Sequence, residues 1–319
     1  MEVIKIGVIG VGFWGRNHVR VFSEIPNVEV EAVCDIDYER AKQVALKYKV
    51  KNYHTSIDEV LEKYDLHAVS ICTPSISHAE LTIKSLQAGV NVFVEKPLAS
   101  NLEDCLKVID AVKSSGKIVM TGFIERFNPA VRKARELLDS GEVGDIIMTH
   151  SRRIGQWPER VGDVGVVKDT SIHDIDLARY IFRDDPLSVY AKGGKQKHIR
   201  LEDHVQAILS FKRGTAFIEA NWLTPRKKRE MYITGAEGVI TIQFLTQQII
   251  LEKADIVLEP IIKYEEPLKV ELEYFVESIK NKVKPFPDEV DGAKAVAIAE
   301  SILESIKKNK VVELNLRDM

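Results

Sequence analysis

A lysine at the end of an apolar run is the first residue whose setting suggests chemistry. Glu95, Lys96 and Pro97 directly follow Val90–Val94, a run typical of a buried strand. An ammonium group in a partly dry site can donate to a hydroxyl or oxyanion and stabilise an alkoxide. A surface ion pair with Glu95 is the simpler alternative, but the position at a strand end favours a functional role for Lys96.

A histidine bracketed by carboxylates is the second such residue. His173 lies in the stretch KDTSIHDID, four residues after Asp169 and three before Asp176. Ser171 and Asp174 have the spacing of an N-cap and its capping-box partner, which predicts a helix that starts at Ser171. The dipole of that helix would oppose an imidazolium and leave a neutral imidazole as a general base. The stretch could also suggest a metal site, but no clear further ligands are present, and we expect no metal.

The chain opens with a candidate phosphate-binding loop. Gly10, Gly12 and Gly15 follow the first apolar run and precede a helical pattern. In that context the first glycine permits a tight turn, the second lets the backbone approach a pyrophosphate, and the third lets helix and strand pack closely. Asp35, which ends the next apolar run, can accept from both ribose hydroxyls and would repel a 2′-phosphate. These residues predict a dinucleotide, NAD rather than NADP, although Arg40 nearby keeps NADP open.

The loop CTPSISH is a second candidate for contact with the cofactor. It contains Cys72, Thr73, Pro74 and His78, and it follows the fourth predicted strand. Its place at the carboxyl end of a parallel strand suits a ligand contact. A turn followed by an ordinary helix residue explains the same letters equally well.

The elements that must position these residues alternate in type over the first 120 residues. Their strands are continuously apolar, which indicates burial on both faces and therefore a parallel, doubly wound sheet. Strands are predicted at 3–9, 28–34, 68–72, 90–94 and 118–121, and helices at 14–24, 38–48, 58–62, 80–87 and 102–114.

The pattern changes after Thr121 to a helix followed by consecutive strands. Consecutive strands with short turns predict an antiparallel sheet that is open on one face. We therefore expect two domains, 1–122 for the dinucleotide and 123–319 for substrate binding and assembly, with a C-terminal helix that can pack back on the first. Helices are predicted at 128–140, 268–281 and 289–308, and strands at 144–154, 187–191, 204–211, 215–222, 230–234, 239–243 and 249–252.

Composition limits the possible classes of protein. The chain has 319 residues, with 45 Lys and Arg against 48 Asp and Glu, and its net charge of −3 argues against nucleic-acid and membrane-surface partners. Cys34, Cys72 and Cys105 are far apart in apolar or helical stretches, which indicates buried free thiols in a reducing compartment. No signal peptide and no apolar run of about 18 residues is present, so we expect a cytoplasmic protein.

Taken together, the motifs resemble the glucose–fructose oxidoreductase and inositol dehydrogenase (Gfo/Idh/MocA-like) family over nearly the whole chain. They are GVIGVGFWG, AVCD, CTPSISH, VEKPLA, GFIERFNP and D-x-x-x-H-D-I-D. The resemblance implies a Rossmann domain, an α+β domain with a large open sheet, and NAD(P)-linked oxidation of a sugar or cyclitol hydroxyl. It places the family's catalytic residues on Lys96, Asp169 and His173. The matching motifs add Phe13, Trp14, Glu95, Lys96, Pro97 and Arg126 to the expected cofactor contacts.

The stretch HSRRIGQWPERVGDVGVV is similar to the branch that oxidises the 3-hydroxyl of UDP-N-acetylglucosamine or its uronic acid. Guanidinium groups suit phosphates, and an aromatic ring suits stacking. Alternatively, the arginines pair with acidic residues of the same loop, Glu159 and Asp163. The stretch contains Arg152, Arg153, Trp157 and Arg160. The expected substrate-binding residues are Lys96, Arg153, Trp157, Arg160, Asp169 and His173.

The expected mechanism is hydride transfer from a substrate hydroxyl to NAD. His173 takes the hydroxyl proton, Asp169 orients the sugar ring or the imidazole, and Lys96 stabilises the developing alkoxide. A myo-inositol or free-sugar dehydrogenase is the alternative enzyme, and a non-catalytic NAD-binding sensor is the alternative of another class.

The second-domain sheet also predicts assembly. One face must be covered by helices, and an apolar opposite face cannot remain wet. We therefore expect sheet-to-sheet packing in a homodimer or homotetramer. The apolar strand residues used for this expectation are Ile208, Phe217, Ile218 and Ile233.

Overall fold

The structure is a computed structural model that describes residues 3–158, 163–316 and 319. The chain divides into two compact units. The first contains Met1–Gly122 and Leu268–Ala293, and the second contains Phe123–Pro267 and Lys294–Met319. The chain therefore leaves the first unit after Gly122, returns to it, and leaves it again.

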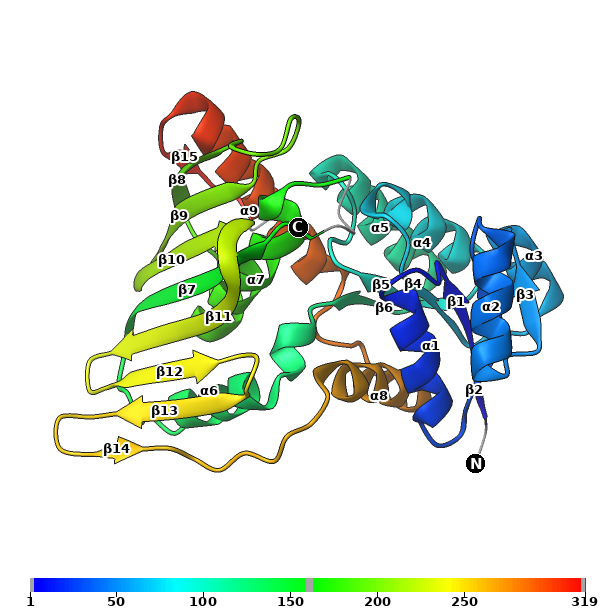
Figure 1. Ribbon diagram of the computed structural model, residues 1–319, viewed down its shortest axis with the longest axis horizontal. Coiled ribbons are helices and arrows are strands. Elements are labelled where there is room, and N and C mark those ends of the chain that lie inside the picture. Colours follow the sequence, from blue (N-terminus) through cyan, green and yellow to red (C-terminus); the bar gives the residue numbers. More distant parts are fainter. Residues whose placement is uncertain (1–2, 159–162, 317–318) are drawn as a thin grey trace. The chain divides into compact units, whose positions relative to one another are not determined.

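The first unit is built on a parallel sheet of six described strands in the order β3-β2-β1-β4-β5-β6 (Figure 1). The predicted doubly wound parallel sheet is confirmed. The order reverses between β1 and β4, so the carboxyl ends of β1, β4 and β5 are where such sheets place ligands. The strands are β1 (Ile4–Ile9), β2 (Val28–Cys34), β3 (Asn52–His54), β4 (Ala68–Ile71), β5 (Asn91–Glu95) and β6 (Val119–Gly122).

Helices connect these strands, and local capping residues set several of their ends. The side chain of Asp37 accepts from the backbone of Arg40, and that of Asn101 accepts from Asp104, which satisfies N–H groups that the first helical turn leaves unpaired. Gly116 ends one helix with a positive φ of 65°. The helices are α1 (Gly15–Glu24), α2 (Tyr38–Tyr48), α3 (Ile57–Lys63), α4 (His78–Gln87) and α5 (Leu102–Ser115), with the short 3₁₀ turn η1 (Ser75–Ser77) before α4.

A late segment completes the first unit. The helix α8 (Pro267–Asn281) buries Phe275, whose ring centroid lies 5.6 Å from that of Phe93 on β5. After α8 the chain pairs with β6, because Thr121 donates from its backbone to Pro287 and from its hydroxyl to Asp288. The sequence-based division assigned all of 123–319 to one domain, whereas residues Leu268–Ala293 belong to the first unit.

The described part of the second unit forms a nine-stranded sheet in the order β14-β13-β12-β11-β7-β10-β9-β8-β15 (Figure 1). Consecutive strands pair antiparallel from β8 to β10 and from β11 to β14, as predicted. The strand β7, however, pairs in parallel with β10 and lies between β10 and β11. The sheet is therefore mixed and mainly antiparallel. Its strands are β7 (Ile146–Gln156), β8 (Ser188–Gly194), β9 (His204–Phe211), β10 (Gly214–Asn221), β11 (Leu223–Gly235), β12 (Val239–Gln243), β13 (Gln248–Glu252), β14 (Val257–Leu258) and β15 (Val312–Glu313).

Helices cover one face of this sheet. The helix α6 (Pro129–Asp139) packs on β12 and β13, and α7 (Ile172–Phe182) packs on β7 and β10. Residues of α6, α7, β11, β12 and β13 share one apolar core. The 3₁₀ turn η2 (Ile124–Phe127) precedes α6, the π turn η3 (Val167–Ser171) precedes α7, and the part of α9 (Glu289–Lys308) from Lys294 onward also belongs to this unit.

The other face of the sheet carries a row of partly exposed side chains. Ile208 is opposite Phe217, Phe217 is opposite His150, and His150 is opposite Tyr232 in the strand register. Ile208 is 42% exposed, and the other three side chains are half-buried. Two of the residues expected on this face, Ile218 and Ile233, lie in the core instead, because alternate residues of a strand point to opposite faces.

Two further observations concern the expectations from composition. The three cysteines are free, and Cys34 and Cys105 are buried, whereas Cys72 is half-buried. Among the described residues, no helix combines the length and the apolar character that crossing a bilayer requires.

Candidate active site

The glycine-rich loop between β1 and α1 has the geometry of a dinucleotide cradle. Gly10 has a φ of +81°, and a Cβ there would lie 2.7 Å from Thr73. A Cβ on Gly15 would lie 1.8 Å from the carbonyl oxygen of Gly10, whereas a Cβ on Gly12 would meet nothing within 4 Å. Thus Gly10 and Gly15 are required by close packing, and Gly12 leaves open space beside the backbone. This pattern fits the roles of the three glycines in binding a pyrophosphate.

Asp35 at the end of β2 holds this loop. It is 6% exposed, and its carboxylate accepts from the backbone N–H groups of Val11, at 2.9 Å, and Asp37, at 3.0 Å. The guanidinium of Arg40 donates to the same carboxylate at 3.0 Å, although the Arg40 side chain is 48% exposed. The expected ribose acceptor is therefore also a structural support of the loop, and it is paired with a basic side chain.

The two aromatic residues of the loop differ in exposure. Phe13 is 55% exposed, with the guanidinium of Arg16 5.2 Å from its ring centroid. The indole Nε1 of Trp14 is buried and finds no acceptor among the described residues. A buried donor without an acceptor is costly. A bound cofactor that supplied an acceptor would relieve this cost, so the loop fits a dinucleotide in this respect too.

His78 braces the two loops that follow β4 and β5. Its Nδ1 lies 2.7 Å from the carbonyl oxygen of Pro97, and its Nε2 lies 2.8 Å from that of Thr73. Because carbonyl oxygens only accept, both ring nitrogens must carry protons for both bonds to form. The imidazole is 1% exposed, so His78 serves to hold the loops together. The half-buried Thr73 and the exposed Pro74 belong to the loop that it supports.

A buried ion pair joins α1 to the strand that precedes Lys96. Nε2 of His18 lies 3.0 Å from Oε1 of Glu95, and its Nδ1 lies 2.9 Å from the hydroxyl of Ser70. Burial alone lowers the pKa of His18, but Cys72 and Glu95 raise it more, to about 10. Burial alone raises the pKa of Glu95, but the bond to His18 and its charge lower it below its usual value. Both groups are therefore charged at neutral pH.

Lys96 follows this pair at the carboxyl end of β5. Its backbone N–H lies 3.3 Å from Oε2 of Glu95, and its side chain is half-buried. The bond to Pro97 is cis. The sequence analysis selected Glu95 and Lys96 but missed His18. The only signal for His18 was its position, three residues after Gly15 on the buried face of a helix.

The segment that carries Asp169 and His173 differs from the expected helix start. Ser171 has helical dihedral angles and makes no capping hydrogen bond, so the predicted N-cap is wrong. The π turn η3 precedes α7 and continues the helix toward the N-terminus. His173 therefore does not lie at a free helix end, and the dipole argument for its neutral state does not apply. π turns are frequent at functional sites.

Exposure distinguishes His173 from its neighbours. Within residues 171–178, all of them described, every side chain is buried except that of His173, which is half-buried. Asp169 is 6% exposed, and the hydroxyl of Thr170 donates to it at 3.2 Å. The π turn thus leaves the imidazole accessible, while the nearby carboxylate is largely enclosed.

The other two carboxylates of this stretch take part in buried ion pairs. Asp176 accepts two hydrogen bonds from Arg126, at 2.5 and 2.7 Å. Asp174 accepts two from Arg153, at 3.0 and 3.1 Å. Arg126 is 4% exposed. Because Asp176 holds its guanidinium, Arg126 has a structural role in addition to any contact with a cofactor.

Arg153 also belongs to this buried network. It is 2% exposed, and it donates to Glu125 at 2.7 Å as well as to Asp174. Burial alone lowers the pKa of Arg153, but these two carboxylates raise it above its usual value. Burial and the charge of Arg153 lower the pKa of nearby Arg229 to about 10. A phosphate would have to displace two buried carboxylates to reach Arg153, which argues against the expected phosphate contact.

The remaining residues of the expected substrate loop have different settings. Arg160 and Glu159 lie outside the described residues. Arg152 pairs with Glu219 on β10 at 3.0 Å. Trp157 is half-buried, its ring stacked on His198 with centroids 4.6 Å apart and the planes 7° from parallel.

The fold and the glycine-rich loop define a dinucleotide-binding protein of the Rossmann class. Comparison with known families supports this: residues 4–123 match the model described as "Oxidoreductase family, NAD-binding Rossmann fold", and residues 131–241 match the "GFO/IDH/MocA C-terminal domain". The chain belongs to the GFO/IDH/MocA family and is an NAD-dependent dehydrogenase. The resemblance inferred from the motifs and the expectation of NAD are confirmed.

Relatives and solved structures match nearly the whole chain. Inositol 2-dehydrogenase 3 of Saccharopolyspora erythraea is 28% identical and covers 99% of this chain and 96% of its own length. The NAD(+)-dependent scyllo-inositol 2-dehydrogenase of Bacillus subtilis is 29% identical over 98% of this chain and 97% of its own. The solved UDP-N-acetylglucosamine 3-dehydrogenase GnnA of Acidithiobacillus ferrooxidans has a TM-score of 0.88 and 26% identity, over 97% of this chain and 99% of its own.

Proposed function

We propose that this dehydrogenase oxidises the 3-hydroxyl of UDP-N-acetylglucosamine or of its uronic acid. The observation that carries the proposal is a cluster of three rings, Trp157, His198 and Trp222, connected to the segment of Asp169. Trp222 contacts Trp157 edge to face at a centroid distance of 4.8 Å, and its indole donates to Thr170 at 2.9 Å. A free sugar or cyclitol offers little for such a cluster to contact beyond the reacting ring, whereas a nucleotide offers a base and phosphates.

Each proposed catalytic residue has a role that its chemistry permits. His173, accessible in an otherwise buried stretch, takes the proton of the substrate hydroxyl. Asp169 orients the substrate ring or the imidazole, and Lys96 donates to the developing alkoxide. NAD, bound along the glycine-rich loop and Asp35, supplies the hydride acceptor when present.

A cyclitol or free-sugar dehydrogenase is the second candidate. It is favoured by relatives named as inositol 2-dehydrogenases that match 98–99% of this chain, although at 26–29% identity. Sequence identity at this level leaves room for a changed substrate, because function is determined by the site rather than the fold.

A substrate comparison tests the two candidates. NADH absorbance would be followed with UDP-N-acetylglucosamine, its uronic acid, N-acetylglucosamine and myo-inositol, each with wild type and Lys96→Ala. Higher kcat/KM on a nucleotide-linked sugar, lost in Lys96→Ala, supports the proposal. Higher kcat/KM on inositol or a free sugar would replace it with the second candidate.

We also propose that the enzyme is a homodimer or homotetramer that packs through the row Ile208, Phe217, His150 and Tyr232. His150 and Phe217 are in edge-to-face contact at 4.9 Å, so the row forms a continuous aromatic and aliphatic strip. Such strips on exposed sheet faces are typical of protein interfaces.

A further inference from the structure

Several chain segments meet at one end of the nine-stranded sheet. Asn221 at the end of β10 is paired with His204 at the start of β9, and Leu223 at the start of β11 is paired with Gln156 at the end of β7. Trp157, Trp222 and the loop 195–203 between β8 and β9 therefore emerge from the same end. Sequence reasoning chose only Trp157 among these residues, because the contacts depend on strand register.

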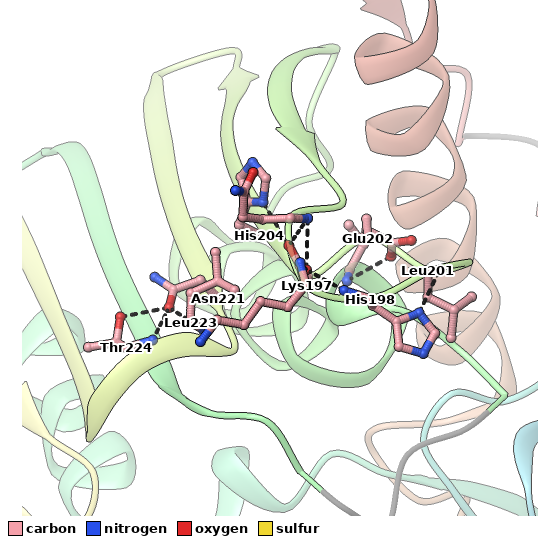
Figure 2. Close-up of polar contacts among 11 residues, drawn as sticks. Lys197, His198, Leu201, Glu202, His204, Asn221, Leu223 and Thr224 are labelled. Atoms are coloured by element: carbon pink, nitrogen blue, oxygen red, sulfur yellow. Dashed lines mark hydrogen bonds and ion pairs between the residues drawn. The ribbon is translucent and has the colours of Figure 1, made fainter.

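A single buried carboxylate organises the loop 195–203. Asp203 is 0% exposed and accepts from the backbone N–H groups of Gln196, Lys197 and His198 at 2.6–3.0 Å. The ring of His204 lies 2.9 Å from the same carboxylate. Figure 2 labels three residues of this group, Lys197, His198 and His204. Burial alone raises the pKa of Asp203, but these hydrogen bonds lower it far below its usual value. The loop thus has a defined shape.

This shape determines the tautomer of His198. Its Nδ1 accepts from the backbone N–H groups of Leu201, at 2.8 Å, and Arg200, at 3.2 Å (Figure 2). Since Nδ1 is an acceptor, the neutral ring carries its proton on Nε2. Stacking on Trp157 fixes the plane of the ring. His198 is half-buried and presents an oriented N–H donor.

This end of the sheet is connected to the catalytic segment at two points, Glu202 of the loop and Trp222 after β10. The carbonyl oxygen of Glu202 accepts from the backbone of Val166 at 3.0 Å, and its carboxylate accepts from Val167 at 3.2 Å. Trp222 donates to Thr170, next to Asp169. A substrate whose reacting hydroxyl lies at Asp169 therefore has one of its sides close to this end of the sheet.

Several of the exposed side chains in this loop and at the start of β11 are basic. Lys195, Lys197 and Arg200 are exposed in the loop, while Arg226 and Lys228 are exposed at the start of β11. These five basic side chains outnumber the two acidic residues of the loop, Glu202 and Asp203. In a chain of net charge −3, this is a local concentration of positive charge.

We propose that the loop 195–203 binds the phosphates of a nucleoside diphosphate, the non-reacting part of the substrate. His198 donates from Nε2, and Lys197 and Arg200 supply the positive charge. This inference rests on the proposed function and assigns phosphate recognition to residues other than Arg153. His198 is thus a specificity-determining residue.

Calorimetric titration of the NAD-bound enzyme with UDP and with uridine tests the inference. We expect UDP to bind at least about 10-fold more tightly than uridine, because only UDP carries the phosphates. The double substitution Lys197→Met, Arg200→Met should weaken UDP binding by about 10-fold or more and leave uridine binding unchanged. Lys212→Met with Arg213→Met, two exposed basic residues in the turn at the other end of β9 and β10, is the matched control.

Variants of His198 separate its donor from its structural role. The variant His198→Asn can still accept from Leu201 but lacks a donor at the position of Nε2, and we expect about 5-fold weaker UDP binding. His198→Gln, whose amide nitrogen reaches farther, should recover part of that loss. An unchanged affinity for UDP in the basic double variant would overturn the inference. Equal weakening of UDP and uridine, or a drop in melting temperature that accounts for the loss, would also overturn it, because it would indicate a structural role.

Turnover distinguishes the failure of this inference from that of the proposed function. Oxidation of UDP-N-acetylglucosamine with a KM unaffected by the loop variants refutes the loop as phosphate site and keeps the substrate. Loop-dependent UDP binding without oxidation of any UDP-sugar supports the site as one for a nucleoside diphosphate and refutes the proposed substrate.

Discussion

Nε2 of His18 on α1 lies 3.0 Å from Oε1 of Glu95 at the end of β5. This pair links the helix of the glycine-rich loop to the strand that carries Lys96. The pair lies inside the first unit, where water cannot readily solvate either charge if its partner is lost. Its charge state therefore couples the folding stability of the enzyme to pH.

The first prediction concerns this pH dependence. The pKa of His18 is raised from 6.5 to about 10, so its stabilising contribution is complete below about pH 6.5 and is lost as pH rises through about 10. Glu95 has a lowered pKa, so its contribution is present above about pH 4.5 and is lost as pH falls. His18→Gln should lower the free energy of unfolding by about 3 kcal/mol near neutral pH. Denaturant unfolding at several pH values should show this difference shrinking between about pH 8 and pH 11; a pH-independent difference would contradict the assignment.

The second prediction concerns cofactor choice. Asp35→Ala removes the ribose acceptor and the negative charge, and it leaves Arg40 without that partner. We expect the KM for NAD to rise by about 10-fold and the preference for NAD over NADP to narrow or reverse. Steady-state kinetics with both cofactors measure this. Arg40→Ala is the control, and it should increase the preference for NAD.

The third prediction concerns the chemical step. Lys96→Ala and His173→Ala should each lower kcat by about 100-fold or more, while NAD still binds, because each removes a group that acts on the developing charge or the proton. Fluorescence titration with NADH checks binding. Lys113→Ala, whose side chain is 72% exposed on α5, should behave as wild type. Near-normal turnover of His173→Ala across pH would remove His173 from the mechanism.

The fourth prediction concerns the arginines of the 150–167 stretch. Arg153→Ala leaves Glu125 and Asp174 buried without their main partner, so it should destabilise the protein by about 3–5 kcal/mol. Thermal unfolding measures this loss. Arg160→Ala should instead raise the KM for the nucleotide-linked substrate by about 10-fold with kcat unchanged, because a remote contact acts in the ground and transition states alike. An unchanged melting temperature together with a raised KM in Arg153→Ala would restore the original expectation of a phosphate contact.

The fifth prediction concerns assembly. Light scattering at micromolar concentration should show a dimer or tetramer for wild type. Ile208→Glu should shift it toward monomer, because a carboxylate cannot be buried in an apolar interface without cost. Ile261→Glu, at a fully exposed position, is the control. A monomeric wild type would contradict the proposed interface.

Where the periodicity is strong, the sequence predicts the fold closely. The helices over 38–48 and 289–308 and the strands over 204–211 and 239–243 have the predicted bounds, because each has a regular pattern and clear turn residues at its ends. The strand β3 (Asn52–His54) was missed, since three half-buried residues show no recognisable alternation. The parallel pairing of β7 with β10 was also missed, because register between distant strands leaves no local signal.

The candidate site shows the same limit. Glycine spacing predicted the cofactor loop, and the position of Lys96 directly after the strand β5 agrees with the predicted strand end. The prediction of an N-cap at Ser171 was wrong because the π turn η3 continues the helix toward the N-terminus, so that Ser171 has helical dihedral angles. Arg153 was predicted to contact a phosphate because the sequence does not show whether an arginine on a strand faces solvent or a buried carboxylate.

The return of residues Leu268–Ala293 to the first unit has a consequence during synthesis. Phe275 and the segment paired with Thr121 leave the ribosome only after the strands β7 to β14 of the second unit. Until then the nascent Rossmann sheet lacks α8, and Phe93 is deprived of its late aromatic partner. The first unit is therefore completed only late in synthesis, and we expect a fragment ending at Gly122 to be less stable than the whole unit because it lacks α8 and the segment paired with β6.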